Sequence, residues 1–267
     1  MRVGTPFSLV SVRVPGASSL DAELFRRRTE SAYEAILDAI GAHHLVRVWN
    51  FIPGILEPFG GLDHRYMVFN GARHSAYERR FGGTEAFDRF VPTASGVGTS
   101  GAALEVHALV STTPSTPLEN PRQIASYFYS TSYGPLPPCF ARAAILTSPA
   151  FAERRLLVGG TASIRGQDTL HLEDRDAQFE ETLDNLAAIV ARGLGEPACA
   201  IENADRRQEL LGRYRQLRVY YVQAEDATWA RDEALRSFSG AERVETRQAD
   251  LCRDGLLVEI EGWATLS

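Results

Sequence analysis

Arg73 and Tyr77 stand four residues apart in NGARHSAYERRF, the first of three segments whose residue types suit chemistry better than packing. On a helix, residues at this spacing share one face. Arginine presents a planar fork that binds a carboxylate with two hydrogen bonds, and a tyrosine hydroxyl can complete such a site. The pair therefore predicts a carboxylate-binding position. A plain surface helix with charges at Glu78, Arg79 and Arg80 fits the same letters equally well.

The second segment combines three tyrosines with an arginine in an apolar setting. Tyr127, Tyr129 and Tyr133 flank or precede the proline-rich turn YGPLPP, and Arg142 follows within an otherwise apolar, strand-like run. Burying an unpaired charge is costly, so we expect Arg142 to meet an anion. That anion is either a substrate group or the carboxylate of a structural salt bridge, which is the more frequent partner of such an arginine.

The third segment is LLVEIEGWA, residues 256–264. Strand alternation places Glu259 and Glu261 on one face and Val258 and Ile260 on the other. Two carboxylates at this spacing are usually solvated. If one of them is buried, desolvation raises its pKa and keeps it protonated near neutral pH, which is the state that a general acid needs.

Other short motifs resemble cofactor sites but lack the context that those sites need. Gly96, Gly98 and Gly101 form a GxGxxG, yet the alternation of Leu104 and Val106 predicts a strand where a dinucleotide site needs a helix. We expect this segment to be a glycine-rich connection between strands. GGTASIRG lacks the signatures of a phosphate loop and of a nucleophile elbow, and the six histidines show neither HxxxH nor HxH spacing. The sequence thus predicts no nucleotide site and no metal site.

The composition argues against several classes of partner. The chain has 267 residues, 44% of them hydrophobic, and a formal net charge of −6, so no overall basic field attracts nucleic acid or an anionic membrane. It lacks a run of about 18 apolar residues, and its first 15 residues lack the apolar core of a signal peptide. Cys139, Cys199 and Cys252 are widely spaced and form no CxxC pair, which argues against a disulfide framework. We expect a cytoplasmic globular protein that binds an anion in a local pocket of arginines.

The hydrophobic pattern predicts the elements that position these residues, and it predicts them twice. Helices are expected around residues 33–40, 72–81, 179–193 and 227–238, and strands at 45–52, 90–95, 102–111, 217–224, 244–251 and 256–264. Each half therefore has the order helix, strand, helix, strand, strand, which indicates an internal duplication. Chance likeness between two α+β stretches is the alternative.

Two sequence matches support the duplication. Arg47-Val48-Trp49 matches Arg218-Val219-Tyr220, and Glu105-Val106 matches Glu259-Ile260 at an equivalent place. Residues 111–138 lie between the halves and are rich in Pro, Ser and Thr, which is typical of a connecting loop.

Taken whole, the chain resembles the chorismatases, a family with a RidA/YjgF-like fold. The matching segments are RVWNFIPGI (47–55), YMVFNGARHSAY (66–77), PTASGVGT (92–99), PLENPRQIASYFYS (117–130), YGPLPPCFARA (133–143) and GGTASIRG (159–166). The resemblance implies an α+β fold of two tandem RidA/YjgF-like (chorismate-mutase-like) units, with mixed β-sheets and helices packed on one face. It implies a degenerate N-terminal unit at 1–115, a connection at 116–137 and a C-terminal unit at 138–267. Whether residues 5–14 supply the opening strand of the first half stays open.

The resemblance also implies a reaction that needs no metal or organic cofactor. Chorismate is a dianion with an enolpyruvyl ether on a cyclohexadiene ring, and Glu259 would be the acid that protonates the enol methylene carbon. The remaining assignments concern substrate binding: Arg73 and Tyr77 for one carboxylate, Tyr129 and Arg142 for the other, and Thr161, Ala162 and Ser163 nearby.

Cys252 and Gly166, on opposite walls of the site, are implied to steer the product. Cys252 resembles the branch that releases pyruvate and 3-hydroxybenzoate through an arene oxide, and this is the activity that we predict. A buried cysteine that only fills space on a strand is the plain alternative. Other possible outcomes are hydrolysis to pyruvate and a 3,4-dihydroxycyclohexa-1,5-dienoate, or a mixture of 3- and 4-hydroxybenzoate.

Two other functions stay open at this point: a RidA-like enamine deaminase and a non-catalytic ligand-binding module. The substrate is expected to be a small dianion, with neither nucleic acid nor a membrane as partner. Simple RidA-like proteins are trimers with sites between subunits. Because a fused pair of units can build its site within one chain, we favour a monomer over a trimer.

Overall fold

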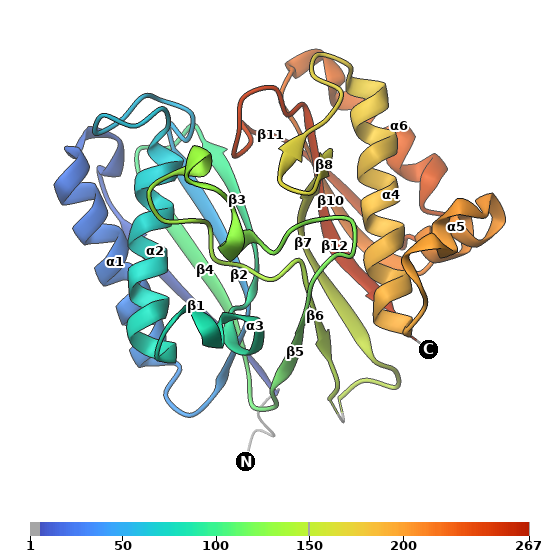
Figure 1. Cartoon of the computed structure of the whole chain (residues 1–267), viewed down its shortest axis with the longest axis horizontal. Helices are drawn as coiled ribbons and strands as arrows, with labels where there is room; N and C mark the ends of the chain where they lie inside the picture. Colours follow the sequence, from blue (N-terminus) through green and yellow to red (C-terminus); the bar gives the residue numbers. More distant parts are fainter. Residues whose placement is uncertain (1–5, 149, 267) are drawn as a thin grey trace.

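Two mixed β-sheets form the centre of the molecule, and helices cover the outer side of each sheet (Figure 1). The computed structural model describes residues 6–148 and 150–266. The N-terminal half contains β1 (Phe7–Val14), α1 (Ala22–Ala39), β2 (His44–Pro53), α2 (Arg65–Phe81), α3 (Phe87–Phe90), β3 (Thr93–Thr99) and β4 (Leu104–Ser111). The C-terminal half contains β5 (Ser115–Leu118), β6 (Ala143–Leu146), β7 (Arg155–Ala162), β8 (Ile164–Arg165), β9 (Asp168–Thr169), α4 (Arg175–Leu194), α5 (Ala204–Leu211), β10 (Tyr214–Tyr221), α6 (Ala227–Ser237), β11 (Arg243–Gln248) and β12 (Val258–Thr265).

The two sheets repeat one topology. The N-terminal sheet has the strand order β1-β4-β2-β3, and the C-terminal sheet has β7-β12-β10-β11, extended beyond β7 by β6 and β5. In each sheet the central strand, β2 or β10, pairs in parallel with one neighbour and antiparallel with the other. The predicted repeat and the α+β class are confirmed, with the short helices α3 and α5 added. β1 is the opening strand of the first half, in the place that β7 has in the second.

Helix boundaries follow local capping chemistry. The Asp21 side chain accepts from the backbone N–H of Leu24 (2.8 Å) at the start of α1, and Asp174 does the same with Ala177 (3.0 Å) at α4. α4 continues past its predicted end at residue 193 and stops at Gly195, whose φ of 82° suits glycine.

The strand predicted at residues 90–95 continues into the glycine-rich segment as β3, so the prediction of a connection was wrong at Gly96 and Gly98. Glycine usually weakens a strand, unless a neighbour approaches too closely for a side chain. Here a Cβ on Gly98 would lie 2.9 Å from the Cβ of Asp250, and one on Gly96 would lie 3.2 Å from the ring of Tyr66. β4 follows directly, so no helix N-terminus meets the GxGxxG.

The strand register corrects the alignment of the two halves. β2 places Trp49 opposite His107, and β10 places its equivalent, Tyr220, opposite Glu259. Glu259 therefore corresponds to His107, and the predicted match with Glu105 was wrong by two residues. The connecting segment also differs from expectation, because residues 115–118 form an edge strand that pairs with β6. The domain boundaries themselves remain a prediction.

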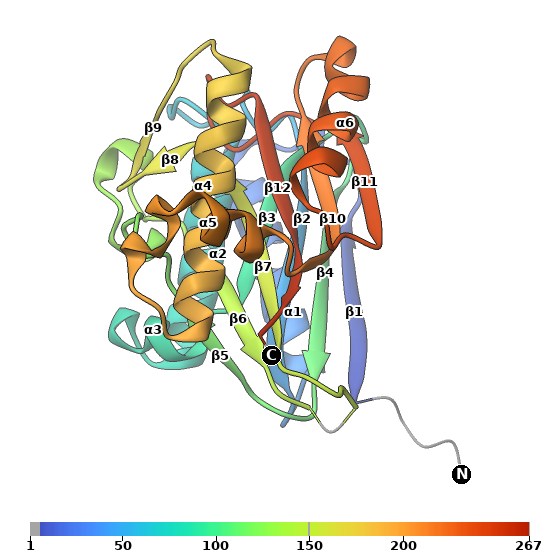
Figure 2. The same cartoon turned by 90° about the vertical axis from the view of Figure 1, so that its right-hand side faces the viewer.

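The two halves meet along β3 and β7. Each half has its own apolar core between its sheet and its helices. At the junction, the N–H of Gly159 donates to the carbonyl of Arg142 (2.9 Å), and a Cβ on Gly159 would lie 2.6 Å from the carbonyl oxygen of Ala94. Figures 1 and 2 both show β3 beside β7 at the centre of the molecule.

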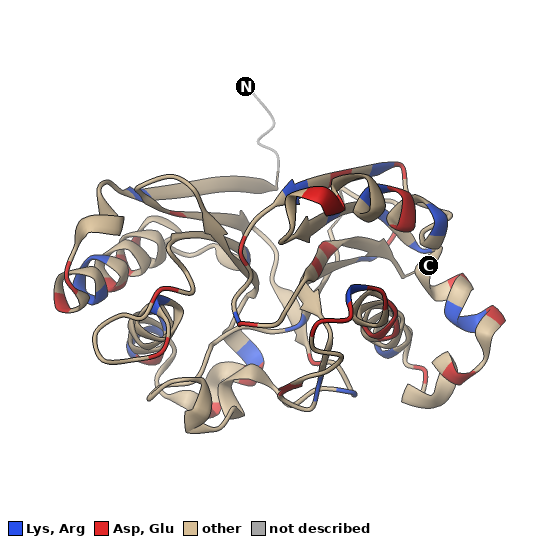
Figure 3. Cartoon of the chain, turned by 90° about the horizontal axis from the view of Figure 1, so that it is seen from above, with Lys and Arg blue, Asp and Glu red and all other residues tan. Residues whose placement is uncertain are grey.

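Charged residues of both signs follow the outer helices (Figure 3). Within residues 6–148 and 150–266, no helix has the length and apolar character needed to cross a membrane.

Candidate active site

A small cavity between the two sheets brings the predicted acid and one predicted arginine together. Its volume is about 20 Å³, and its lining comes from both halves of the chain: Tyr66, Arg73, Ala94, Ser95, Gly96, Phe140, Gly160, Cys252 and Glu259. Helix α2 and strand β3 supply the N-terminal part of this lining, and β7, β12 and the loop before β12 supply most of the rest. The cavity exists only where the two halves meet.

Glu259 is buried in this cavity, with 4% of its surface exposed. Burial raises the pKa of its carboxyl group to about 8, and the charge of Glu261 adds to the rise, while Arg47 and Arg142 oppose it. The carboxyl group occupies space that only glycine leaves free, because a Cβ on Gly160 would collide with its Oε1 and lie 2.7 Å from its Cδ. Glu259 is therefore protonated at neutral pH, as a general acid must be.

Glu261 is as deeply buried as Glu259, and it lies in a network of donors, unlike most carboxylates at this spacing, which are solvated. Arg47 Nη2 donates to Glu261 Oε2 (2.8 Å) and Arg218 Nη1 donates to Oε1 (3.1 Å). Further donors are the indole of Trp49 (3.0 Å), the hydroxyl of Tyr220 (3.3 Å) and the hydroxyl of Ser95. Two guanidinium groups thus hold Glu261 as a fixed anion two residues from Glu259.

Arg73 and Arg142 are buried without a salt bridge to any described residue, although the buried carboxyl group of Glu119 interacts with Arg142 over a longer distance. Only 1% of Arg73 and 5% of Arg142 is exposed, and neither forms an ion pair within the described part of the chain. Arg73 Nη2 donates to Asn70 Oδ1 (2.9 Å), and Arg142 Nη2 donates to the hydroxyl of Tyr129 (2.5 Å) and to the carbonyl of Ile124 (3.1 Å). The Nε–H of each arginine is buried and has no acceptor. Because an uncompensated buried charge is costly, these two groups are suited to binding anions from outside the chain.

One aromatic side chain separates the two arginines. The Cζ of Arg142 lies 5.0 Å from the ring centroid of Phe140, and that of Arg73 lies 5.8 Å from the same centroid. Two cationic groups thus flank one ring beside a protonated carboxyl group. This arrangement can bind a molecule with two carboxylates and deliver a proton to it.

Tyr129 lies with Arg142 as predicted, but the structure does not bring Tyr77 to the cavity. The Tyr77 ring packs at 5.4 Å against the rings of Tyr33 and Phe81, and its buried hydroxyl has no partner. Tyr66, on the same helix, lines the cavity instead.

The segment 161–163 contributes less than predicted. The hydroxyls of Thr161 and Ser163 donate to the carbonyls of Gly159 (3.0 Å) and Leu170 (3.0 Å), and only Ala162 lies opposite Glu259 on the neighbouring strand.

Gly166 also lies away from the cavity, in the turn between β8 and β9, with φ at 61°. Its N–H donates to the carbonyl of Arg122, and its carbonyl accepts from Ile124 (2.9 Å each).

Cys252 lines the cavity. It lies in the loop before β12, whereas the alternative interpretation placed it on a strand as a space-filling residue. Burial raises the pKa of its thiol to about 11, and the charge of Glu259 adds to this. The thiol is therefore neutral and shapes the wall beside Glu259.

Sequence reasoning missed Tyr66, Ser95, Gly160 and the arginines that hold Glu261. The Arg-Val match between residues 47–48 and 218–219 was a signal for these arginines, although nothing in it showed that both meet one carboxylate. The residues described here contain no cluster of three or more His, Cys, Asp or Glu side chains able to hold a metal ion.

Comparison with known proteins places this geometry in a family. Residues 6–110 match the family described as "Chorismatase FkbO/Hyg5-like, N-terminal". The chain is 32% identical over 239 residues to a chorismatase of Streptomyces rapamycinicus, covering 88% of this chain and 69% of that protein. It is 32% identical over 244 residues to a 3-hydroxybenzoate synthase of Streptomyces hygroscopicus, covering 89% and 69%.

A solved structure agrees with these matches. A crystal structure of chorismatase superposes with a TM-score of 0.77 at 28% identity, covering 97% of this chain and 74% of the other. The structural match covers 97% of this chain and therefore includes residues of both halves. The chain belongs to the chorismatase family.

Proposed function

We propose that this protein cleaves chorismate into pyruvate and 3-hydroxybenzoate, with Glu259 as the catalytic acid. One observation carries the proposal: a buried carboxyl group with a raised pKa lies beside two buried guanidinium groups that form no salt bridge within the described residues. Chorismate supplies the two carboxylates and the proton-accepting carbon that this set of groups requires. The 32% identity to a 3-hydroxybenzoate synthase supports the same product.

The two arginines position the substrate. Arg73 donates one hydrogen bond to Asn70 and binds one substrate carboxylate with its remaining N–H groups. Arg142, which is hydrogen-bonded to Tyr129, binds the other carboxylate. Each new ion pair satisfies a buried guanidinium and a desolvated carboxylate at once. Fixing both ends of the dianion holds the enolpyruvyl group against Glu259, which is the entropic part of the catalysis.

Glu259 then protonates the methylene carbon of the enolpyruvyl group. The electrons of the carbon–carbon double bond form the new C–H bond and leave an oxocarbenium ion. The oxygen of the neighbouring ring hydroxyl attacks the ring carbon that bears the ether. The bond from that carbon to the ether oxygen breaks, and its electrons complete the keto group of pyruvate.

The hydroxyl proton returns to the Glu259 carboxylate, so the acid is regenerated. The arene oxide opens, and the ring loses a proton to become 3-hydroxybenzoate. No water is consumed on this route. A neutral Cys252 thiol beside Glu259 would keep water from the carbon under attack, which is how we assign it to product choice.

The pH dependence follows from the protonated form of the acid. Because the pKa of Glu259 is about 8, activity should fall as the pH rises through that value. This sign is opposite to the one expected for an enzyme that uses an ionised glutamate as a base.

Incubation with chorismate tests the proposal directly. Pyruvate is measured by a coupled assay, and the ring product of the same sample is identified by chromatography. Equal amounts of pyruvate and 3-hydroxybenzoate are expected. Pyruvate with a dihydroxycyclohexadienoate would reassign the branch, and no pyruvate release would overturn the proposal.

A further inference from the structure

The cavity at Glu259 is too small for the proposed substrate as it stands. A volume of about 20 Å³ holds about one water molecule. A six-membered ring with two carboxylates therefore reaches Glu259 only if neighbouring side chains move. Which of them move depends on the side from which the substrate comes.

Three larger pockets lie near the cavity, and only one of them shares lining residues with it; the pocket of about 440 Å³ lined by Arg47, Trp49 and Glu261 does not. The first, which we call the vestibule, has a volume of about 400 Å³ and shares Tyr66 and Cys252 with the cavity. The rest of its lining includes Met67, Tyr133, Thr169 and Arg253. Tyr66 and Cys252 thus form the wall between the vestibule and Glu259.

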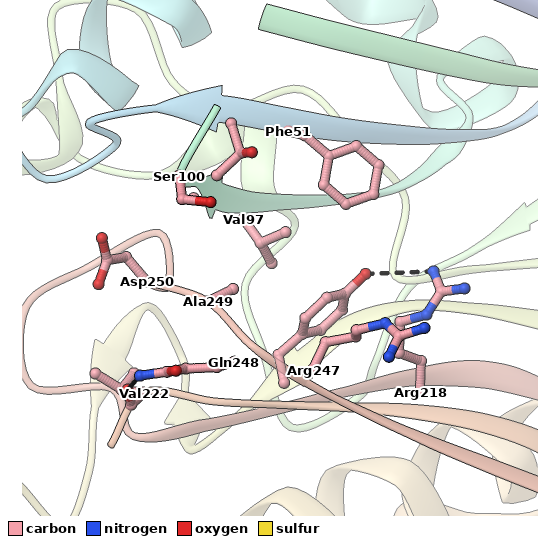
Figure 4. A pocket seen from close by; sticks show the side chains of 12 residues that line it. Phe51, Val97, Ser100, Arg218, Val222, Arg247, Gln248, Ala249 and Asp250 are labelled. Atoms are coloured by element: carbon pink, nitrogen blue, oxygen red, sulfur yellow. Dashed lines mark hydrogen bonds between the residues drawn. The ribbon is translucent and has the colours of Figure 1, made fainter. Parts of the chain in front are cut away.

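The second pocket is a groove of about 610 Å³ that shares no lining residue with the cavity. Figure 4 shows Phe51, Val97, Arg218 and Arg247 around it. Tyr220 also lines this groove, and its hydroxyl accepts from Arg218 Nη1 (3.5 Å). Both residues of that bond are held by Glu261. Entry from this side would break the network that fixes Glu261, so the vestibule is the favoured approach.

Arg253 stands at the inner end of the vestibule, next to Cys252. Its Cζ lies 4.0 Å from the ring centroid of Tyr133 and 5.0 Å from that of Tyr129. Its one hydrogen bond in the described part of the chain is from Nη1 to the carbonyl of Gln167 (2.5 Å). The Tyr129 hydroxyl in turn accepts from Arg142, so Tyr129 connects the vestibule arginine to the arginine of the site.

The backbone that carries Arg253 is fixed at both ends. The carbonyl of Asp250 accepts from the N–H of Gly98 (2.7 Å), and the carbonyl of Gly255 accepts from Gln178 Nε2 (2.6 Å). The guanidinium itself forms no ion pair with any of the residues that the structure describes. The Arg253 side chain can therefore move without the loop. It loses only its contacts with the Tyr129 and Tyr133 rings and its hydrogen bond to Gln167.

We propose that chorismate enters through the vestibule and that Arg253 is a specificity-determining residue, which binds an incoming carboxylate and passes it to Arg142 along Tyr129. The inference rests on the proposed function. The vestibule also contains exposed Asp63, Asp168 and Asp254, and Asp254 is paired with His64 (3.3 Å). These carboxylates are exposed, so water screens them more than it screens the half-buried Arg253, which is the one Lys or Arg side chain in this lining.

Neutralising Arg253 is the first arm of the test. Arg253→Gln should lower kcat/KM for chorismate about tenfold at low salt while kcat stays within about twofold, and the loss should shrink as salt rises. Arg253→Lys should restore most of kcat/KM. Arg231→Gln, an exposed site on α6, removes the same charge elsewhere and should match the wild type. A merely structural role for Arg253 would lower kcat too, without a dependence on salt.

Blocking each pocket is the second arm. Thr169→Trp fills the vestibule and should lower kcat/KM at least about tenfold, whereas Ser100→Trp fills the groove and should not. Equal kcat/KM in Arg253→Gln and Arg231→Gln, or a loss confined to Ser100→Trp, would overturn the inference while wild-type pyruvate release upholds the proposed function. Absence of wild-type pyruvate release would overturn both.

Discussion

Strands β4 and β12 have equivalent places in the two sheets, but they carry different chemistry. Where β12 has Glu259 and Glu261, the register gives β4 the residues His107 and Leu109. His107 is partly exposed and hydrogen-bonded to the Ser11 hydroxyl (2.8 Å), whereas Glu259 is buried beside the cavity. The acid belongs to one half alone, and the other half supplies Arg73 and the wall that buries that acid.

A second comparison concerns four buried or half-buried arginines: two form salt bridges with other described residues and two do not. Arg47 and Arg218, at equivalent positions, both converge on Glu261 and are satisfied by it. Arg73 and Arg142 are as deeply buried as Arg47, yet neither forms an ion pair within the described residues, although Glu119 and Glu259 lie close enough to Arg142 to interact with its charge. We propose that the paired arginines stabilise the junction between the sheets and that the unpaired ones bind substrate. The following substitutions test that division.

Arg73→Met and Arg47→Met should have opposite effects. Arg73→Met removes an uncompensated buried charge, so it should melt at or above the wild-type temperature while chorismate binding weakens by about 2–5 kcal/mol. Arg47→Met leaves Glu261 with one guanidinium fewer and should destabilise the fold by about 3 kcal/mol. Thermal melts and KM values on the same preparations check this. An Arg73→Met enzyme with wild-type KM would place the carboxylate site elsewhere.

Gly160→Ala should displace the carboxyl group of Glu259 while leaving Glu259 itself unchanged. The added methyl group collides with Glu259 Oε1, so the carboxyl group must turn away from the substrate, and kcat should fall about 10²-fold. Gly71→Ala is the matched control, because a Cβ there meets no atom within 4 Å. Comparable kcat in the two variants would mean that the position of Glu259 is not critical.

Glu261→Gln should change the pH profile more than the maximal rate. The Glu261 charge helps to raise the pKa of Glu259, so its removal lowers that pKa. The protonated acid is then lost at lower pH, and the alkaline limb of kcat/KM should move below about pH 8. A profile measured from pH 5 to 10 checks the shift. An unmoved alkaline limb would show that Glu261 has only a structural role.

Cys252→Ala should have the smallest effect on rate. Pyruvate release should stay within a few-fold of wild type, since protonation by Glu259 is common to both branches. The space left by the thiol should admit water and move the ring product toward the hydrolysed diene. Chromatography of the ring product measures the ratio, and an unchanged ratio would remove Cys252 from product choice.

Sequence patterns predicted the four longest helices, strands β2 to β4 and β10 to β12, and the repeat, because these depend on local periodicity. They missed the glycine-containing end of β3, whose glycines are explained only by Tyr66 and Asp250 packing against them. They also failed on register, since pairing between strands is invisible in the sequence of either strand.

The site was predictable where a residue type contradicts its setting. Arg142 in an apolar run and paired glutamates on a half-apolar strand both signalled chemistry. The partners of Glu261 could not be predicted, because Arg47 lies 214 residues away along the chain. The prediction placed Tyr77 beside Arg73 in the cavity because both lie on one face of α2. Only part of that face lines the cavity, and the sequence does not show which part.

The most direct measurement is pyruvate release by Glu259→Gln beside chorismate binding by the same variant. Glutamine keeps the size of the side chain but has no acidic proton to give to carbon. The variant should bind chorismate with near wild-type Kd and release pyruvate on the order of 10²-fold more slowly, or worse. Pyruvate release within a few-fold of the wild-type rate would contradict the assignment of Glu259 as the acid.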